Sequence, residues 1–293
     1  MLRKLRLSAE LVVFQHTIFA LPFAFMGMLL AARGLPSAKV FVLIVVAMVG
    51  ARTAAMSFNR LTDERYDRRN PRTAGRPLPS GRLSRTWAIG LCVASSALFV
   101  LAAAGLNPLC LYLSPLALGL ILSYSLTKRF SALTHVHLGA SLGLAPVGAW
   151  IAVTGRPAFA PVILGVAVCL WTAGFDIIYA CQDVGFDRGA GLHSLPARLG
   201  VPSALKISAV LHALMVITLA ILPFATRLGV AYVLGVVAVA VILVVEHRLV
   251  RPDDLSRVNA AFFAANGWIS VGLLAATILD LVVAGGWWLQ PSM

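Results

Sequence analysis

Nine stretches of apolar residues, each long enough to cross the hydrocarbon core of a bilayer, constrain this chain more than any other feature of its sequence. A transmembrane α-helix needs about 20 consecutive, mostly apolar residues. The composition agrees, since 60% of the 293 residues are hydrophobic, only 12% are charged and the mean hydropathy is +0.90. We therefore predict an all-α integral membrane protein, with nine transmembrane helices in a single bundle and one domain over 1–293. The expected spans are 11–32, 40–58, 86–104, 108–126, 132–153, 159–181, 205–225, 228–246 and 260–285.

The basic residues lie mostly in the short connections between these stretches. A net charge of +13 is compatible with nucleic-acid binding, but bases confined to loops are typical of the cytoplasmic side of a membrane protein. With the N-terminus inside, the outer loops hold only Arg33, Lys39, Arg156 and Arg227. We therefore expect a protein of a bacterial-type inner (plasma) membrane with a cytoplasmic N-terminus, and no nucleic-acid partner.

Three oxygen-bearing side chains follow the second stretch at a spacing of four residues. Asn59, Asp63 and Asp67 are called the first acidic ladder below. Spacing of i, i+4 and i+8 places side chains along one helical face. Neighbouring carboxylates repel unless a cation lies between them, and oxygen ligands suit magnesium. For one such ladder alone, a solvated helix end paired with nearby arginines is an equally simple interpretation.

A second acidic ladder, Asp176, Asp183 and Asp187, ends the sixth stretch at offsets of 7 and 11 residues. These offsets return to almost the same helical face. An even number of membrane crossings separates the ends of the second and sixth stretches, so both ladders face the same side. Two ladders on one side favour a shared, cytoplasm-facing cavity with bound magnesium over two unrelated charged helix ends.

Cationic side chains accompany both ladders, and acid with base is the combination that a diphosphate site requires. Carboxylates hold the metal, the metal bridges phosphate oxygens, and guanidinium groups neutralise the remaining charge. The positive-inside rule by itself also explains arginines in these loops, and interfacial Tyr and Lys are ordinary membrane anchors. The candidate diphosphate-binding residues are Arg60, Arg68, Arg72, Arg76, Tyr124, Lys128 and Arg198.

Arg52 is the only arginine inside an expected span. An ionisable side chain at membrane depth marks a functional site by default. Arg52 lies seven positions before Asn59 and so shares the face of the first acidic ladder, where its guanidinium could pair with a carboxylate on an acceptor substrate. The alternative is a structural partner for a buried carbonyl or carboxylate.

The motifs, taken in order, resemble the UbiA superfamily of membrane prenyltransferases. The pattern N-x-x-x-D-x-x-x-D runs on into Asn70-Pro-Arg-Thr73, and it is followed by Y-x-x-x-K from Tyr124 and by D-x-x-Y-A-x-x-D-x-x-x-D from Asp176. The run from His16 to Pro22 is similar to the first helix of the family, and the resemblance covers nearly the whole chain.

The resemblance implies magnesium-dependent transfer of a polyprenyl group from its diphosphate to an aromatic acceptor. It implies that the two ladders bind magnesium and that Tyr124 and Lys128 help to hold the diphosphate. After the ring attacks the allylic cation, Asp176, Asp183 or the departing diphosphate would remove the ring proton. The expected partners are a polyprenyl diphosphate, a small aromatic acceptor and the lipid bilayer, with no obligate protein partner evident.

The sequence is compatible with two kinds of aromatic acceptor and with two other classes of membrane protein. The segment from Phe186 to Ser194 is similar to the quinone-pathway branch, which uses 4-hydroxybenzoate or a dihydroxynaphthoate. A lipid-alcohol phosphotransferase also uses aspartate ladders and metal, and a transporter also places carboxylates near the membrane. A transporter, however, should distribute polar residues across the bilayer. His135, His137 and Cys169 are expected to be packing residues outside the site.

Overall fold

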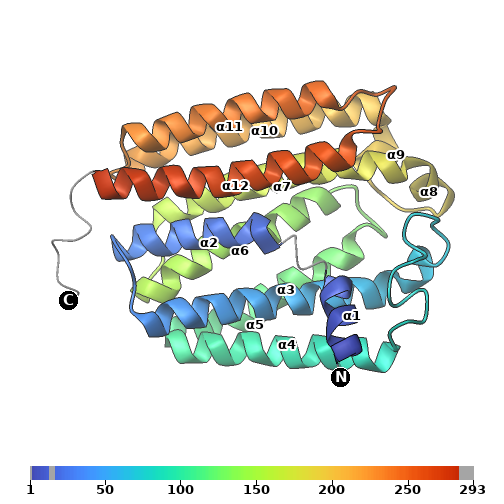
Figure 1. The fold of residues 1–293 in the computed structure, drawn as a ribbon, viewed down its shortest axis with the longest axis horizontal. Helices are drawn as coiled ribbons and strands as arrows, with labels where there is room; N and C mark the ends of the chain where they lie inside the picture. The colour runs from blue at the N-terminus through green and yellow to red at the C-terminus, as the bar shows by residue number, and fades with distance from the viewer. Residues whose placement is uncertain (1, 13–16, 284–293) are drawn as a thin grey trace.

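The computed structural model describes residues 2–12 and 17–283, and every regular element within these ranges is a helix. Figure 1 shows the long helices side by side, with α10, α11 and α12 at one edge of the bundle and α3, α4 and α5 at the other. The helices are α1 (Leu2–Val12), α2 (Thr17–Ala32), α3 (Ala38–Asp67), α4 (Arg85–Leu106), α5 (Pro108–Thr127), α6 (Thr134–Thr154), α7 (Phe159–Ala180), α8 (Val184–Gly189), α9 (Leu195–Leu199), α10 (Val201–Ala225), α11 (Val230–Leu249) and α12 (Val258–Val283).

The predicted all-helical membrane architecture is confirmed. Within the described residues, eight helices are long and apolar enough to cross a bilayer, and each coincides with one of the last eight expected spans. A shorter apolar helix, Phe19–Ala32, corresponds to the first span. The count of nine crossings therefore stays a prediction.

The expected first span, 11–32, is wrong at its start, because two helices share it. α1 continues through Leu11 to Val12, whereas α2 begins at Thr17; His16 lies outside the described residues. α1 mixes basic residues with leucines, a pattern typical of a helix that lies on a surface. Figure 1 shows α1 crossing the bundle direction close to α3. Its buried Leu7 and Leu11 pack against Leu78 and Leu83.

Helices α6 and α7 contact each other through glycines. A Cβ added at Gly143 would lie 2.5 Å from the carbonyl oxygen of Gly165, and one added at Gly139 would overlap the carbonyl oxygen of Cys169. Small residues let membrane helices approach to backbone contact. This glycine seam brings α6 and α7 into backbone contact, and on α6 it begins one turn after His135, which lines the site.

Helix α11 is capped from a distant part of the chain. Its N-terminal backbone lacks a local side-chain cap, and the buried carboxylate of Asp280 on α12 accepts hydrogen bonds from the N–H groups of Gly229 (2.6 Å), Ala231 (2.9 Å) and Tyr232 (3.3 Å). A carboxylate at this position satisfies orphan donors and complements the positive end of the helix dipole.

The C-terminal ends of α3, α5 and α7 lie at the same end of the bundle. Figure 1 shows α8, α9 and the connection between α3 and α4 gathered there. α3 extends nine residues beyond its expected end at 58, because the polar residues of the first acidic ladder continue the helix to Asp67. The ladder therefore stands on a rigid helix where it leaves the apolar part of the bundle.

Candidate active site

An open cavity of about 1910 Å³ lies at this end of the bundle. Both acidic ladders line it, so the structure brings together side chains that are more than 100 residues apart in the sequence. The other candidate residues that line it are Arg52, Arg60, Arg72, Arg76, Tyr124 and Lys128.

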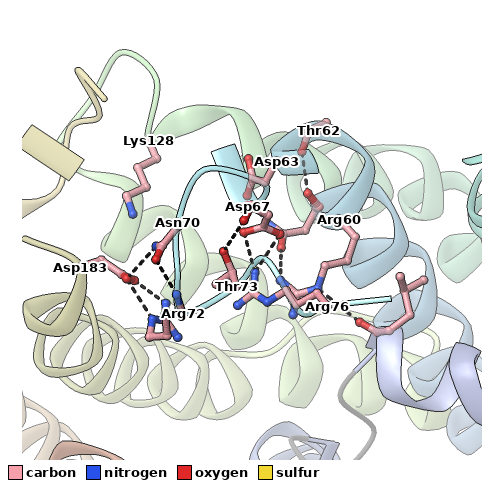
Figure 2. A network of polar contacts seen from close by, with 12 residues as sticks. Arg60, Thr62, Asp63, Asp67, Asn70, Arg72, Thr73, Arg76, Lys128 and Asp183 are labelled. Carbon is pink, nitrogen blue, oxygen red and sulfur yellow. Dashed lines mark hydrogen bonds and ion pairs between the residues drawn. The ribbon is translucent and has the colours of Figure 1, made fainter. Parts of the chain in front are cut away.

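The first acidic ladder is held by hydrogen bonds within α3 and from the connection that follows. The Asn59 side-chain amide donates to Asp63 at 3.0 Å. Arg76 donates to both carboxylate oxygens of Asp67, at 2.8 and 2.9 Å. Arg60 donates to the carbonyl of Leu11 at the end of α1 and to the side-chain oxygen of Asn59, both at 3.3 Å. Figure 2 shows this network converging on the end of α3.

The spacing of the second acidic ladder predicted one continuous helix, but the structure shows that the ladder spans a break between helices. α7 ends at Ala180, and a single 3₁₀ turn, Cys181–Asp183, precedes α8. Asp183 receives hydrogen bonds from the side chain of Asn70 at 3.1 Å and from Arg72 Nε at 2.9 Å, and a second guanidinium nitrogen of Arg72 contacts its other oxygen (Figure 2). The connection after the first ladder thus reaches across the cavity to the second.

Arg72 remains cationic in this setting. Burial acts to lower the pKa of its guanidinium, but the hydrogen bonds and charge of Asp183, together with Tyr179, raise that pKa above its ordinary value. Arg72 Nη1 also donates to the Tyr179 hydroxyl at 3.0 Å. Its positive charge is therefore available at the cavity wall at any physiological pH.

Lys128 and the segment after α8 hold the last carboxylate of the second ladder. Lys128 Nζ lies 2.8 Å from Asp187 Oδ1, and the Ser194 hydroxyl donates to Asp187 Oδ2 at 2.8 Å. Ser194 also caps α9, because its side-chain oxygen accepts the N–H of Ala197. Lys128 and Tyr124, which the sequence placed four residues apart on one face, both line the cavity.

Asp176 has a partner that the sequence analysis missed. His135 was expected to be a packing residue, but its Nδ1 lies 2.7 Å from Asp176 Oδ2 and it lines the cavity. No sequence signal could have joined these residues, since they lie on α6 and α7 and 41 positions apart. His137, two residues on, does bond within the α5–α6 interface as expected, at 2.8 Å from Thr127.

Two candidate diphosphate residues do not line the cavity, and their diphosphate role stays a prediction. Arg68 does not line the cavity but pairs with Glu64 at 2.7 Å on the exposed side of α3. Arg198 is exposed on α9 and also lies outside the cavity lining. Both residues follow a ladder in sequence, but their positions turn their side chains outward. A positive charge next to a ladder therefore does not by itself place a residue in the cavity.

Arg52 lies where the polar cavity meets an apolar pocket. The pocket, of about 1140 Å³, lies among α3, α4, α5 and α6, and six of its lining residues, among them Arg52, Tyr124 and Leu138, also line the polar cavity. Arg52 Nε is buried, and it has no hydrogen-bond partner among the described residues. A buried donor without a partner is costly, which indicates that an anionic or accepting ligand completes this position.

The donor set fits magnesium that arrives with a substrate better than a closed metal cage. Among the described residues no three His, Cys, Asp or Glu side chains converge as a preformed metal site. Magnesium keeps several waters and is usually held by one or two carboxylates plus substrate phosphates. Carboxylates on opposite walls of one cavity, with Asp67, Asp183 and Asp187 already beside a cation, match that mode of binding.

The fold and the cavity together define a polytopic integral membrane enzyme. The chain belongs to the UbiA prenyltransferase family, whose model matches residues 20–279, and it is a prenyltransferase. The protein of Alkalilimnicola ehrlichii named 4-hydroxybenzoate octaprenyltransferase is 31% identical over 263 residues, covering 88% of each chain.

Solved structures share this fold. The apo structure of a UbiA homolog from Aeropyrum pernix K1 is 37% identical, with a TM-score of 0.82 over 91% of this chain and 98% of that chain. A UbiA homolog from Archaeoglobus fulgidus bound to GPP and Mg²⁺ is 22% identical, with a TM-score of 0.75 over 94% of this chain and 99% of that chain.

Proposed function

We propose that this prenyltransferase transfers a polyprenyl group from polyprenyl diphosphate to a small aromatic carboxylate, with 4-hydroxybenzoate as the first candidate acceptor and magnesium as cofactor. The observation that carries the proposal is the convergence of both acidic ladders and their cations on one cavity that continues into an apolar pocket. The names of the curated relatives support 4-hydroxybenzoate as acceptor. The Archaeoglobus fulgidus homolog, which binds GPP and Mg²⁺, supports the donor and the metal.

The polar part of the cavity suits a diphosphate. Arg72, Arg76 and Lys128 each pair with a ladder carboxylate. Magnesium, when bound by the two ladders, neutralises the diphosphate and stabilises it as a leaving group. The arginines and the lysine are then free to bind phosphate oxygens, where negative charge grows as the allylic C–O bond breaks.

The acceptor carboxylate is assigned to Arg52. This guanidinium lies at the junction between the polar cavity and the apolar pocket, and its buried Nε has no partner among the residues that the structure describes. An aromatic carboxylate bound here would lie beside Tyr124 with its ring against apolar walls. Because the isoprenoid tail is insoluble in water, it would lie along the apolar side of the site.

The reaction balances with groups already in the cavity. The C–O bond of the allylic diphosphate breaks with its electron pair on the departing diphosphate, and a ring carbon of the acceptor forms the new C–C bond. The ring proton then passes to a carboxylate of the second ladder, Asp176 or Asp183, or to the diphosphate itself. Exclusion of water by the surrounding helices protects the allylic cation from hydrolysis.

The proposal keeps three further predictions: a bacterial-type inner membrane, a cytoplasmic N-terminus with the cavity on the same side, and one UbiA-like domain over 1–293. The distribution of bases in the loops supports the orientation. Arg65, Arg68, Arg69 and Arg85 surround one outer surface at the cavity end of the bundle, which is the end that this orientation places in the cytoplasm.

A transfer assay tests the function directly. Purified protein is given geranyl diphosphate and magnesium with either 4-hydroxybenzoate or a dihydroxynaphthoate, and the product is followed by mass. Product with 4-hydroxybenzoate supports the proposal as stated, and product with the dihydroxynaphthoate alone moves the acceptor to the bicyclic class. Absence of product with both acceptors, from folded protein, would contradict an aromatic acceptor of this kind.

A further inference from the structure

The contact between His135 and Asp176 joins α6 to α7 at the wall of the cavity. The His135 side chain is 2% exposed, whereas Asp176 is 27% exposed and lines the cavity. His135 is therefore buried behind Asp176 in the cavity wall, and Asp176 is the residue of the pair that a substrate can reach.

Hydrogen-bond donors fix which nitrogen of His135 carries the proton. The backbone N–H of Leu195 donates to His135 Nε2 at 3.3 Å, so Nε2 must be the acceptor. Nδ1 then carries the hydrogen, and it donates to Asp176 Oδ2 at 2.7 Å. Each ring nitrogen of the neutral His135 side chain has one suitable partner, so a flip of the ring would break both hydrogen bonds.

The segment that supplies Leu195 contacts three cavity groups in succession. The His193 N–H donates to the carbonyl of Lys128 at 2.7 Å, the Ser194 hydroxyl donates to Asp187, and the Leu195 N–H donates to His135. One short stretch of backbone thus sets the positions of a cation and, directly or through His135, of two carboxylates.

Helix packing gives this arrangement its rigidity. His135 lies one turn before Gly139 on α6, and the glycine seam holds α6 and α7 in backbone contact from there on. His135 is buried, hydrogen-bonded at both ring nitrogens and held on a rigid helix pair. It therefore restricts the orientation of the Asp176 carboxylate. Asp176 Oδ2 accepts a hydrogen bond from His135, whereas Oδ1 has no hydrogen-bond donor among the described residues and so can interact with a ligand.

We propose that His135 is a positioning residue for Asp176: held by the Leu195 N–H, it orients the Asp176 carboxylate so that one oxygen faces the reacting groups. The inference rests on the proposed prenyl transfer. Outer partners of this kind typically change activity or metal affinity by about 10–100-fold when they are removed.

The kinetic test compares His135→Leu, which removes both bonds and keeps bulk, with His135→Asn, which keeps a donor at the Nδ1 position. His135→Leu is expected to lower kcat by about 10–100-fold with a smaller change in the acceptor KM, and His135→Asn to recover most of the loss. His137→Leu is the matched control, because His137 lies on the same helix but bonds to Ser123 and Thr127 on α5. It should reduce thermal stability and leave kcat of the folded protein unchanged.

Coupling to Asp176 separates positioning from a general packing role. In an Asp176→Asn background, His135→Leu should lower kcat by less than about threefold, because contacting residues are not additive. Losses that multiply would overturn the inference. If wild-type protein transfers no prenyl group, the proposed function fails; if it does and His135→Leu retains full kcat, only the inference fails.

A second measurement needs no activity. In protein labelled with ¹⁵N-histidine and free of metal, the resonance that disappears in His135→Leu should show the Nδ1–H tautomer, and it should shift in Asp176→Asn. An Nε2–H tautomer, or a resonance unmoved by Asp176→Asn, would contradict the contact on which the inference stands.

Discussion

The pair between Arg72 and Asp183 ties the connection after α3 to the end of α7, and its strength can be worked out before it is measured. Arg72 is 32% exposed and Asp183 is 11% exposed. Exposed ion pairs couple by about 0.2–1 kcal/mol, whereas breaking a fully buried pair costs about 3–5 kcal/mol. Because one member of this pair is a third exposed, we expect a coupling free energy of about 1–2 kcal/mol.

A double-mutant cycle measures this coupling. The free energy of unfolding is determined in mixed micelles, without magnesium or diphosphate, for Arg72→Met, Asp183→Asn and the double variant. The double variant should be more stable than the sum of the single effects predicts, by about 1–2 kcal/mol. Each single variant leaves one charged or polar partner at the cavity wall without its main contact, which is the physical origin of the difference.

The same cycle with Arg85→Met and Glu64→Gln provides the control. Arg85 contacts Glu64 at 2.7 Å but is 61% exposed, so its coupling should be about 0.5 kcal/mol or less. Equal coupling in the two cycles would refute the reasoning, because it would mean that water screens the cavity pair as fully as a surface pair.

Four further outcomes are expected. Asp63→Ala or Asp183→Ala should abolish transfer while the protein still folds in detergent, and activity retained in both would contradict their metal roles. Arg52→Ala should raise the KM of the aromatic acceptor more than that of the donor, and an unchanged acceptor KM would argue against the carboxylate assignment. Removing divalent cations with EDTA should stop transfer and added magnesium should restore it; turnover that is insensitive to EDTA would exclude the proposed cofactor. Asp280→Ala should lower the free energy of unfolding by about 1–3 kcal/mol, because three backbone N–H groups lose their acceptor, and a thermal midpoint equal to that of the wild type would rule this out.

Most of the bundle could be predicted from sequence because apolar length determines membrane helices directly. The expected spans at 108–126 and 159–181 differ from α5 and α7 by a residue at most at each end. The first span failed because hydrophobicity alone does not separate Leu11, which packs α1 against the cavity end of the bundle, from the apolar run of α2.

The site was predictable only where it follows helical periodicity. Spacing on α3 placed Asn59, Asp63 and Asp67 on one face, and they line one cavity. Partners that come from another helix leave no periodic signal, which is why His135 was missed. That Arg68 does not line the cavity could not be read from the sequence either, because the basic residues of a loop look alike until its path is known.

The Asp280 cap has a consequence for how the protein enters the membrane. The start of α11 exposes N–H donors whose acceptor on α12 is synthesised about 50 residues later. Until that residue arrives, these donors have only water at the membrane surface to satisfy them, because the start of α11 has no local side-chain cap. The start of α11 therefore completes its hydrogen bonds only when α12 packs beside it, and a chain that ends after α11 lacks the carboxylate that accepts them.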